Sequence, residues 1–85
     1  MAIRQAAPKG RIVRNPRVLG GEPIVRGTRI PVRSIVLAAR EYDGTEGVLT
    51  AYPQLTLIDV QDALAFYAAH KAEIDWDIQA NLADD

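Results

Sequence analysis

Three arginines are crowded into eight residues of the first half of the chain, and no acidic residue lies between them. They are Arg26, Arg29 and Arg33. A guanidinium group carries five donors in a planar fork that suits phosphate and carboxylate oxygens. We therefore expect these three side chains to form one anion-binding surface, with either DNA phosphates or an acidic protein face as its ligand.

The charges of the chain are divided between its two halves, although the net charge is only −1. Residues 1–40 hold nine cations and one acid, which gives +8, whereas residues 41–85 hold one cation and ten acids, which gives −9. A basic half favours an anionic partner. Alternatively, the two halves pair with each other, within one fold or across a dimer. The sequence leaves both interpretations open.

Residue types that perform catalysis or bind metals are scarce. The chain has no cysteine and a single histidine, His70, and its carboxylates form no clustered motif. Gly20-Gly21 is not followed by the glycine pattern of a phosphate-binding loop. We expect His70 to lie on the surface or to cap a helix end. The sequence thus predicts a binding protein rather than an enzyme, with no catalytic residue, metal or cofactor.

The size and hydropathy of the chain narrow its class further. Its 85 residues form one small domain, so large multi-layer enzyme folds are excluded. No apolar run approaches the roughly 20 residues that span a membrane. The N-terminus lacks the apolar centre of a signal peptide. We expect a cytoplasmic protein with no membrane partner.

Short β-prone segments are predicted to precede the helices. Residues 11–14 and 23–26 are strand candidates, separated by the turn signal Gly20-Gly21. Gly27 closes the second segment, and Thr28 is placed to satisfy backbone groups beside it. Such a hairpin-like unit is too small to be stable alone, so it must pack on another element. Residues 1–10 are expected to form a flexible arm.

Helical periodicity begins after Pro31, with Val32, Ile35, Val36 and Ala39 on one face and an end at Asp43-Gly44. Thr45 is the expected N-cap of a short helix from residue 46 to residue 51 or 52, which Pro53 stops.

Thr56 and Asp59 have the spacing of a capping box for a longer helix that runs to about residue 70. We therefore predict a mostly α fold, in which a small N-terminal β-hairpin-like unit packs on a three- to four-helix bundle. The middle pair of helices, around the break at 53–56, has the outline of a helix-turn-helix. The expected core comprises Ile24, Ile30, Val32, Ile35, Val36, Leu49, Leu57, Val60, Leu64 and Tyr67.

The segment from Asn15 to Val32 carries a more specific signal. Its run Gly-Gly-Glu-Pro-Ile-Val-Arg-Gly-Thr-Arg-Ile-Pro-Val resembles the signature of the bacterial family called domain of unknown function 433. The later segments 52–56, Asp59-Val60 and 63–67 also match that family. The resemblance covers about residues 11–70.

This resemblance implies a winged or homeodomain-like helix-turn-helix domain over residues 11–71. Many members of the family are similar to VapB-type antitoxins, which are encoded beside a PIN-like ribonuclease toxin. The implied roles are neutralising the toxin by direct binding, dimerising, and repressing the shared promoter on operator DNA. The alternatives are a stand-alone DNA-binding regulator and a protein-interaction module whose helix-turn-helix is inert.

The second helix of the predicted helix-turn-helix departs from the pattern of a DNA reader. Its expected outward residues are Ile58, Asp59, Gln61, Asp62 and Ala65. Gln61 has the chemistry to read adenine. The two carboxylates, however, repel phosphates, and the helix has no cation before Lys71. If DNA is bound, the arginines of the first half must supply most of the contacts.

Residues 72–85 are expected to form an acidic C-terminal tail helix. Ile74, Ile78 and Leu82 follow one another at intervals of four, and Trp76 lies on the opposite side of a helical wheel. A small monomer is not expected to hide all four side chains. We predict that they bind a partner protein or a second copy of the chain, and therefore that the protein is a homodimer.

Overall fold

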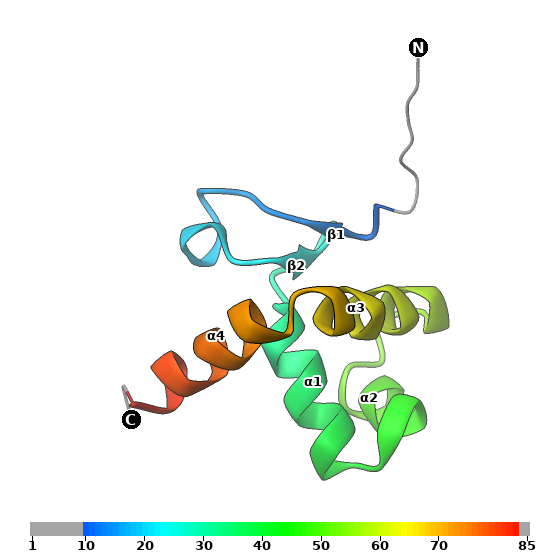
Figure 1. Cartoon of the computed structure of the whole chain (residues 1–85). Coiled ribbons are helices and arrows are strands. Elements are labelled where there is room, and N and C mark those ends of the chain that lie inside the picture. The colour runs from blue at the N-terminus through cyan, green and yellow to red at the C-terminus, as the bar shows by residue number, and fades with distance from the viewer. Residues whose placement is uncertain (1–9, 84–85) are drawn as a thin grey trace.

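Four helices and a two-stranded hairpin make up the structure, a computed structural model that describes residues 10–83 (Figure 1). The predicted mostly α fold with an N-terminal hairpin on a helical bundle is confirmed. The arm expected over residues 1–10 lies outside the described residues, apart from Gly10. The elements are β1 (Ile12–Val13), the short 3₁₀ turn η2 (Leu19–Gly21), β2 (Ile24–Val25), α1 (Val32–Glu41), α2 (Gly44–Ala51), α3 (Leu57–Ala69) and α4 (Lys71–Ala83).

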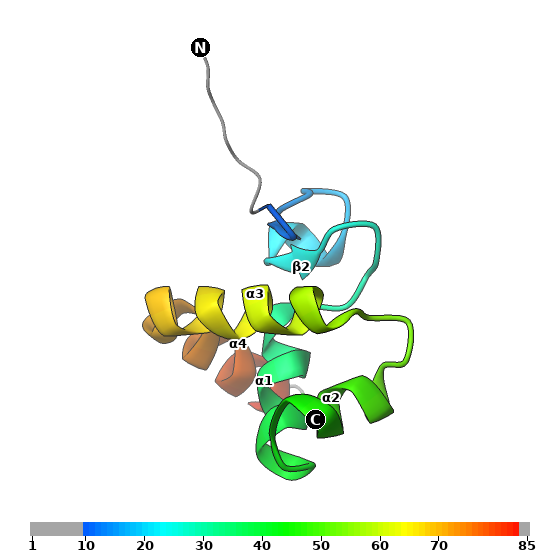
Figure 2. The same cartoon turned by 90° about the vertical axis from the view of Figure 1, so that its right-hand side faces the viewer.

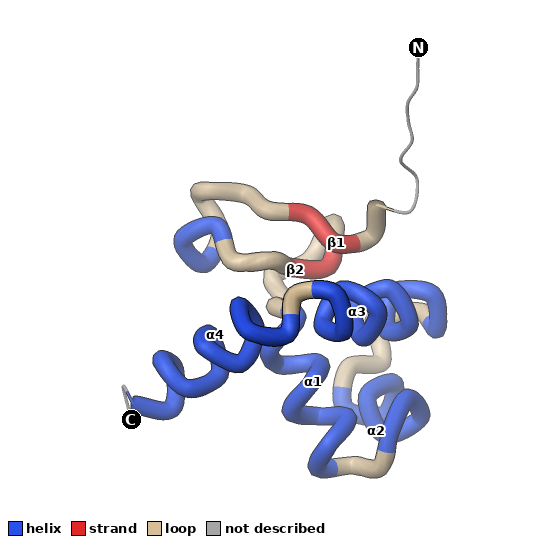
Figure 3. The backbone as a smooth tube through the Cα atoms, viewed as in Figure 1, coloured by secondary structure: helices blue, strands red, loops and turns tan. Residues whose placement is uncertain are grey.

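The two strands pair antiparallel, with Ile12 opposite Val25 and Val13 opposite Ile24. Figure 3 shows the strands in red, joined by a long tan connection that the blue turn η2 interrupts. Figures 1 and 2 both place this hairpin over α3, which β1 contacts. Because the bundle covers one side of the hairpin, two-residue strands suffice to hold it in place.

Helix α1 forms the centre of the bundle and packs against α2, α3 and α4. Pro31 precedes it, and Val32, Ile35 and Val36 are buried, as their spacing predicts. The core adds Val48 from α2, Val60 and Ala63 from α3, and Ile74 and Ile78 from α4. Side chains from every helix therefore meet on α1.

The link between α1 and α2 differs from the prediction. Thr45 is not the N-cap of α2, because the helix begins at Gly44, two residues before the predicted start, with Asp43 as its N-cap. Asp43 has φ 73° and Gly44 has φ 84°, so two consecutive left-handed residues reverse the chain. Because the chain turns at Asp43 and Gly44, Thr45 already lies inside the first turn of the helix and cannot be its N-cap.

The start of α3 follows its predicted capping box. The Thr56 hydroxyl accepts a hydrogen bond from the Asp59 N–H at 3.1 Å, and the Thr56 N–H donates to the Asp59 carboxylate at 2.9 Å. These contacts turn Asp59 inward, so its expected outward position is wrong and the residue is only 7% exposed. The expected burial of Leu57 is also wrong, since its side chain is 49% exposed.

Helices α2 and α3, joined by residues 52–56, have the outline of a helix-turn-helix (Figure 2). Helix α3 ends at Ala69, and His70 is its C-cap, as the sequence predicts. The His70 N–H bonds the Phe66 carbonyl at 2.9 Å, and the His70 carbonyl accepts the Ile74 N–H at 3.1 Å. The tail is thus a separate helix, α4, rather than a continuation of α3.

Candidate functional site

The turn after β2 presents Arg26 and Arg29 to solvent. Gly27, with φ 78°, allows the chain to reverse between them. The Thr28 hydroxyl donates to the Val25 carbonyl at 2.8 Å and accepts the Ile30 N–H at 3.0 Å, which confirms the role expected for this threonine. Because these bonds fix the turn, the two guanidinium groups extend from a defined backbone.

Arg33 does not join the two exposed arginines on their surface. Its side chain is half-buried, and its Nε donates to Glu22 Oε1 at 2.8 Å. The expected three-arginine surface is therefore reduced to Arg26 and Arg29.

Several other arginines of the basic half are used within the fold. Arg11 lies 3.5 Å from the Asp59 carboxylate, and Arg40 lies 3.8 Å from that of Asp75. Arg14 donates two hydrogen bonds, of 2.6 and 2.9 Å, to the Glu73 carboxylate. These pairs support the interpretation in which the two halves neutralise each other. Within residues 10–83, the arginines left without an ion pair are Arg17, Arg26 and Arg29.

The outward side of the first two turns of α3 is apolar rather than basic. Leu57 and Ile58 are 49% and 53% exposed, and Gln61 is exposed beside them. We call these three residues the first-turn face. Asp62 is half-buried, and among the residues of α3 there is no lysine or arginine.

Helix α4 uses one side for the core and leaves the other open. Ile74 and Ile78 are buried against the bundle, so they are taken up by the monomer and are not available to a partner. Trp76 is 72% exposed and Leu82 is 55% exposed. Of the four side chains expected to bind a partner, these two remain on the surface.

The acidic residues of α4 face the fold and its cations. The hydrogen bonds from Arg14 lower the pKa of Glu73, and the hydrogen bonds from Lys71 and Tyr67 lower the pKa of Asp75. Burial raises the pKa of Asp77, whose Oδ2 has no hydrogen-bond partner, and the carboxylates of Glu22 and Glu73 add to the shift. Beyond these pairs, α4 exposes the apolar side chains of Trp76 and Leu82 beside the polar Gln79 and Asn81.

Replacing Asp77 with Asn should stabilise the protein at neutral pH. A carboxyl whose pKa is raised by folding stabilises the folded state below its unfolded-state pKa, and this contribution is lost as the pH rises through the folded-state pKa. The amide carries no charge, so the gain should shrink in acid. Thermal unfolding at neutral and acidic pH measures the difference. Asp75→Asn is the control with the opposite sign, because its lowered pKa makes the charged form stabilising at neutral pH.

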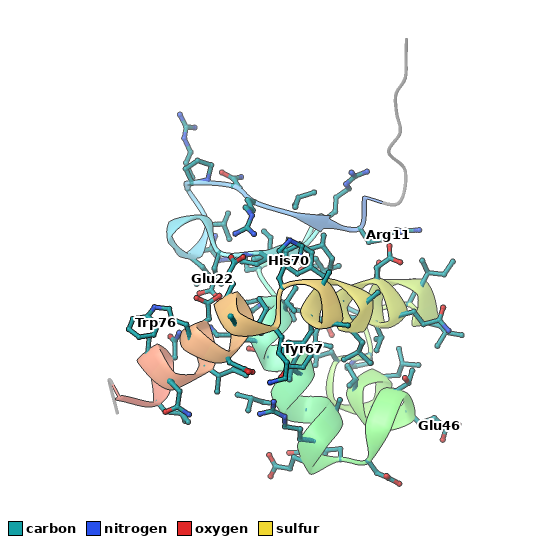
Figure 4. The ribbon with its side chains drawn as sticks, in the orientation of Figure 1. Arg11, Glu22, Glu46, Tyr67, His70 and Trp76 are labelled. Atoms are coloured by element: carbon teal, nitrogen blue, oxygen red, sulfur yellow. The ribbon has the colours of Figure 1, made fainter. Side chains whose placement is uncertain are left out.

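The candidate surfaces lie on opposite sides of the molecule. In Figure 4, Trp76 lies at one side, whereas Arg11 and Glu46 lie at the other, on the hairpin and on α2. The Arg26 N–H donates to the Arg11 carbonyl at 2.7 Å, which places the arginine turn on the same side as Arg11. A partner on α4 and a partner on the hairpin side would not compete for space.

No group of three or more potential metal ligands occurs in the stretch 10–83. In that same stretch, no helix has the length and hydropathy needed to cross a membrane. The ion pair of Arg33 with Glu22 has no counterpart among the predictions from the sequence. The spacing of eleven residues between Glu22 and Arg33 gives no local signal, because the pair meets only after the hairpin folds onto α1.

Comparison with known proteins identifies a family. The profile of the family described as "Protein of unknown function (DUF433)" matches residues 12–67. A crystal structure of a DUF433 member protein from Anabaena variabilis is similar, with 33% identity and a TM-score of 0.74 over 81% of this chain and 68% of that one. Uncharacterized protein y4eO of Sinorhizobium fredii is 38% identical over 50 residues, 59% of this chain, which spans only 23% of the length of y4eO.

Proposed function

This chain belongs to the DUF433 family, and on that premise we propose that it is an antitoxin. In this proposal it binds and neutralises a PIN-like ribonuclease toxin whose gene lies beside its own, and the two proteins meet in the cytoplasm. The activity is binding rather than catalysis. The family resemblance supports the class of partner, and the exposed side of α4 supports the choice of this helix as the proposed binding surface.

The observation that carries the proposal is the exposure of Trp76. Trp76 is 72% exposed, so most of its apolar area contacts water and adds nothing to the packing of the monomer. Tryptophan is also the residue type most enriched among side chains that dominate binding energy at protein interfaces. Ile74 and Ile78 anchor the same helix in the core, so Trp76 and Leu82 extend from a rigid support.

Repression of the shared promoter is the second candidate activity. Arg17, Arg26 and Arg29 make no ion pair within the described range, which favours contact with an anion. Two features argue against it: the exposed side of the first turn of α3 is apolar, and the first turn of α2 carries the acidic Glu46. Since phosphate contacts dominate the affinity of proteins for DNA, we place protein binding first.

Trp76→Ala should weaken the complex with the toxin by about 30-fold, the effect of losing about 2 kcal/mol at an interface hot spot. Titration calorimetry with the purified PIN-like protein measures the dissociation constant. Gln79→Ala is the matched control, because Gln79 is an exposed polar residue of the same helix. Equal dissociation constants for wild type and Trp76→Ala would exclude α4 as the toxin-binding surface.

A further inference from the structure

We propose that the first-turn face of α3 is the contact between two copies of this chain, related by a two-fold axis that passes near Ile58. The proposal concerns the side of the molecule opposite Trp76 and does not depend on the identity of the toxin. It assigns a role to the exposed apolar side chains of α3, which the proposed function leaves unused.

The centre of this surface is apolar. Leu57 and Ile58 are adjacent, and about half of each side chain is exposed. Val60 and Ala63 of the same helix belong to the core of the monomer, whereas Leu57 and Ile58 do not. Two neighbouring large apolar side chains at the start of a helix are costly in water, and a covering partner removes that cost.

The two ends of the surface carry opposite charges. On one side of α3 lies the hairpin turn with Arg26 and Arg29, which are exposed. On the other side lies α2, whose first turn carries the exposed Glu46. Figure 1 shows the order hairpin, α3, α2, and Figure 4 shows Arg11 and Glu46 at the upper and lower ends of this side. Within residues 10–83, Arg26, Arg29 and Glu46 make no ion pair.

A surface with a basic end, an apolar centre and an acidic end is complementary to itself after a rotation of 180°. The rotation brings the arginine turn of one copy against Glu46 of the other, twice, and it stacks the two apolar centres on the axis. This is the arrangement of an isologous dimer, which closes and cannot grow into a filament. The charge pattern therefore fits a second copy of the chain better than it fits DNA, which would repel Glu46.

The proposed dimer leaves both Trp76 surfaces on its outer sides, so it can hold two toxin molecules. It also covers α3, so the helix does not enter a DNA groove while the dimer persists. The proposal agrees with the sequence in expecting a homodimer, but it places the contact between the copies on α3 instead of α4.

Sedimentation of the full chain at high micromolar concentration should give twice the monomer mass of 9.3 kDa. Ile58→Asp should give the monomer mass, because it puts two carboxylates on the axis. Leu19→Asp is the matched control, since Leu19 is another exposed leucine, on η2, and its variant should remain dimeric. Circular dichroism of each variant verifies that the fold is retained. A monomeric wild type, or a dimeric Ile58→Asp, would overturn the proposal.

A charge exchange tests the pairing itself. Arg29→Glu and Glu46→Arg should each weaken self-association by about tenfold, because like charges then meet at both ends of the contact. An equimolar mixture of the two variants should recover wild-type affinity, since each end again joins Arg to Glu. Recovery cannot arise from a contact inside one monomer. A mixture no tighter than either variant alone would refute this pairing, whatever the toxin titrations give.

Discussion

Gly47→Ala is expected to destabilise the protein by about 3 kcal/mol, the upper end of the usual cost of overpacking. Helix propensity alone predicts the reverse, since Ala in place of a mid-helix Gly gains about 1 kcal/mol. The packing decides the sign. A Cβ atom at Gly47 would lie 2.0 Å from the carbonyl oxygen of Tyr42 and 2.5 Å from its Cβ. The carbonyl oxygen belongs to the backbone and the Cβ atom is attached to it, so neither can move unless the backbone of the link between α1 and α2 moves.

Urea unfolding of the variant measures this loss. Thr50→Ala is the control on the same helix, because its side chain is exposed and bonds only to the Glu46 carbonyl one turn earlier. The control should be as stable as the wild type or slightly more so. If Gly47→Ala were also as stable as the wild type, α2 would not pack on Tyr42 as described.

Ile74→Ala is expected to cost about 2–5 kcal/mol, as for other fully buried isoleucines truncated to alanine. Ile74 is 0% exposed and belongs to the core cluster around α1. The loss would show that α4 is an integral part of the domain. Leu82→Ala, on the same helix, should change the stability by less than about 0.5 kcal/mol, because its side chain is 55% exposed.

Chemical denaturation of both variants gives the comparison. An Ile74→Ala variant with the stability of the wild type would mean that α4 detaches in solution, and Trp76 would then lack the rigid support on which its proposed role depends.

The elements of this fold with strong local signals could be predicted from the sequence. Pro31 and the apolar spacing behind it predict α1, and Thr56 with Asp59 predicts the start of α3. The position of Thr28 beside Gly27 predicts the bonds of the hairpin turn. In each case residues close in sequence determine the geometry, so a short window contains the information.

The orientation of α3 could not be predicted from its periodicity. Leu57, Val60 and Leu64 are spaced to share one side of the helix, but the buried residues are Asp59, Val60 and Ala63, so the helix is rotated about its axis relative to the stripe that the spacing predicts. The capping box and the approach of Arg11 decide which side faces inward, because they hold Asp59 against the hairpin. Arg11 is distant in sequence from α3, and its contact is a property of the whole fold.

The partners of the charged residues and of α4 were likewise beyond the sequence. The spacing of Ile74 and Ile78 predicts an apolar side of a helix, but it does not say whether the chain itself or a partner covers that side. The division of charge between the halves has the same ambiguity. The ion pair of Arg14 with Glu73 and that of Arg11 with Asp59 resolve part of it inside the monomer.

An inhibition titration tests whether this protein neutralises a PIN-like ribonuclease by binding it, as we propose. The proposed partner, a purified PIN-like ribonuclease, is supplied with RNA, and cleavage is followed while this protein is added. Our account predicts that cleavage falls to zero at an equimolar ratio, and that Trp76→Ala requires a large excess for the same effect. Undiminished cleavage in the presence of excess wild-type chain would contradict the account.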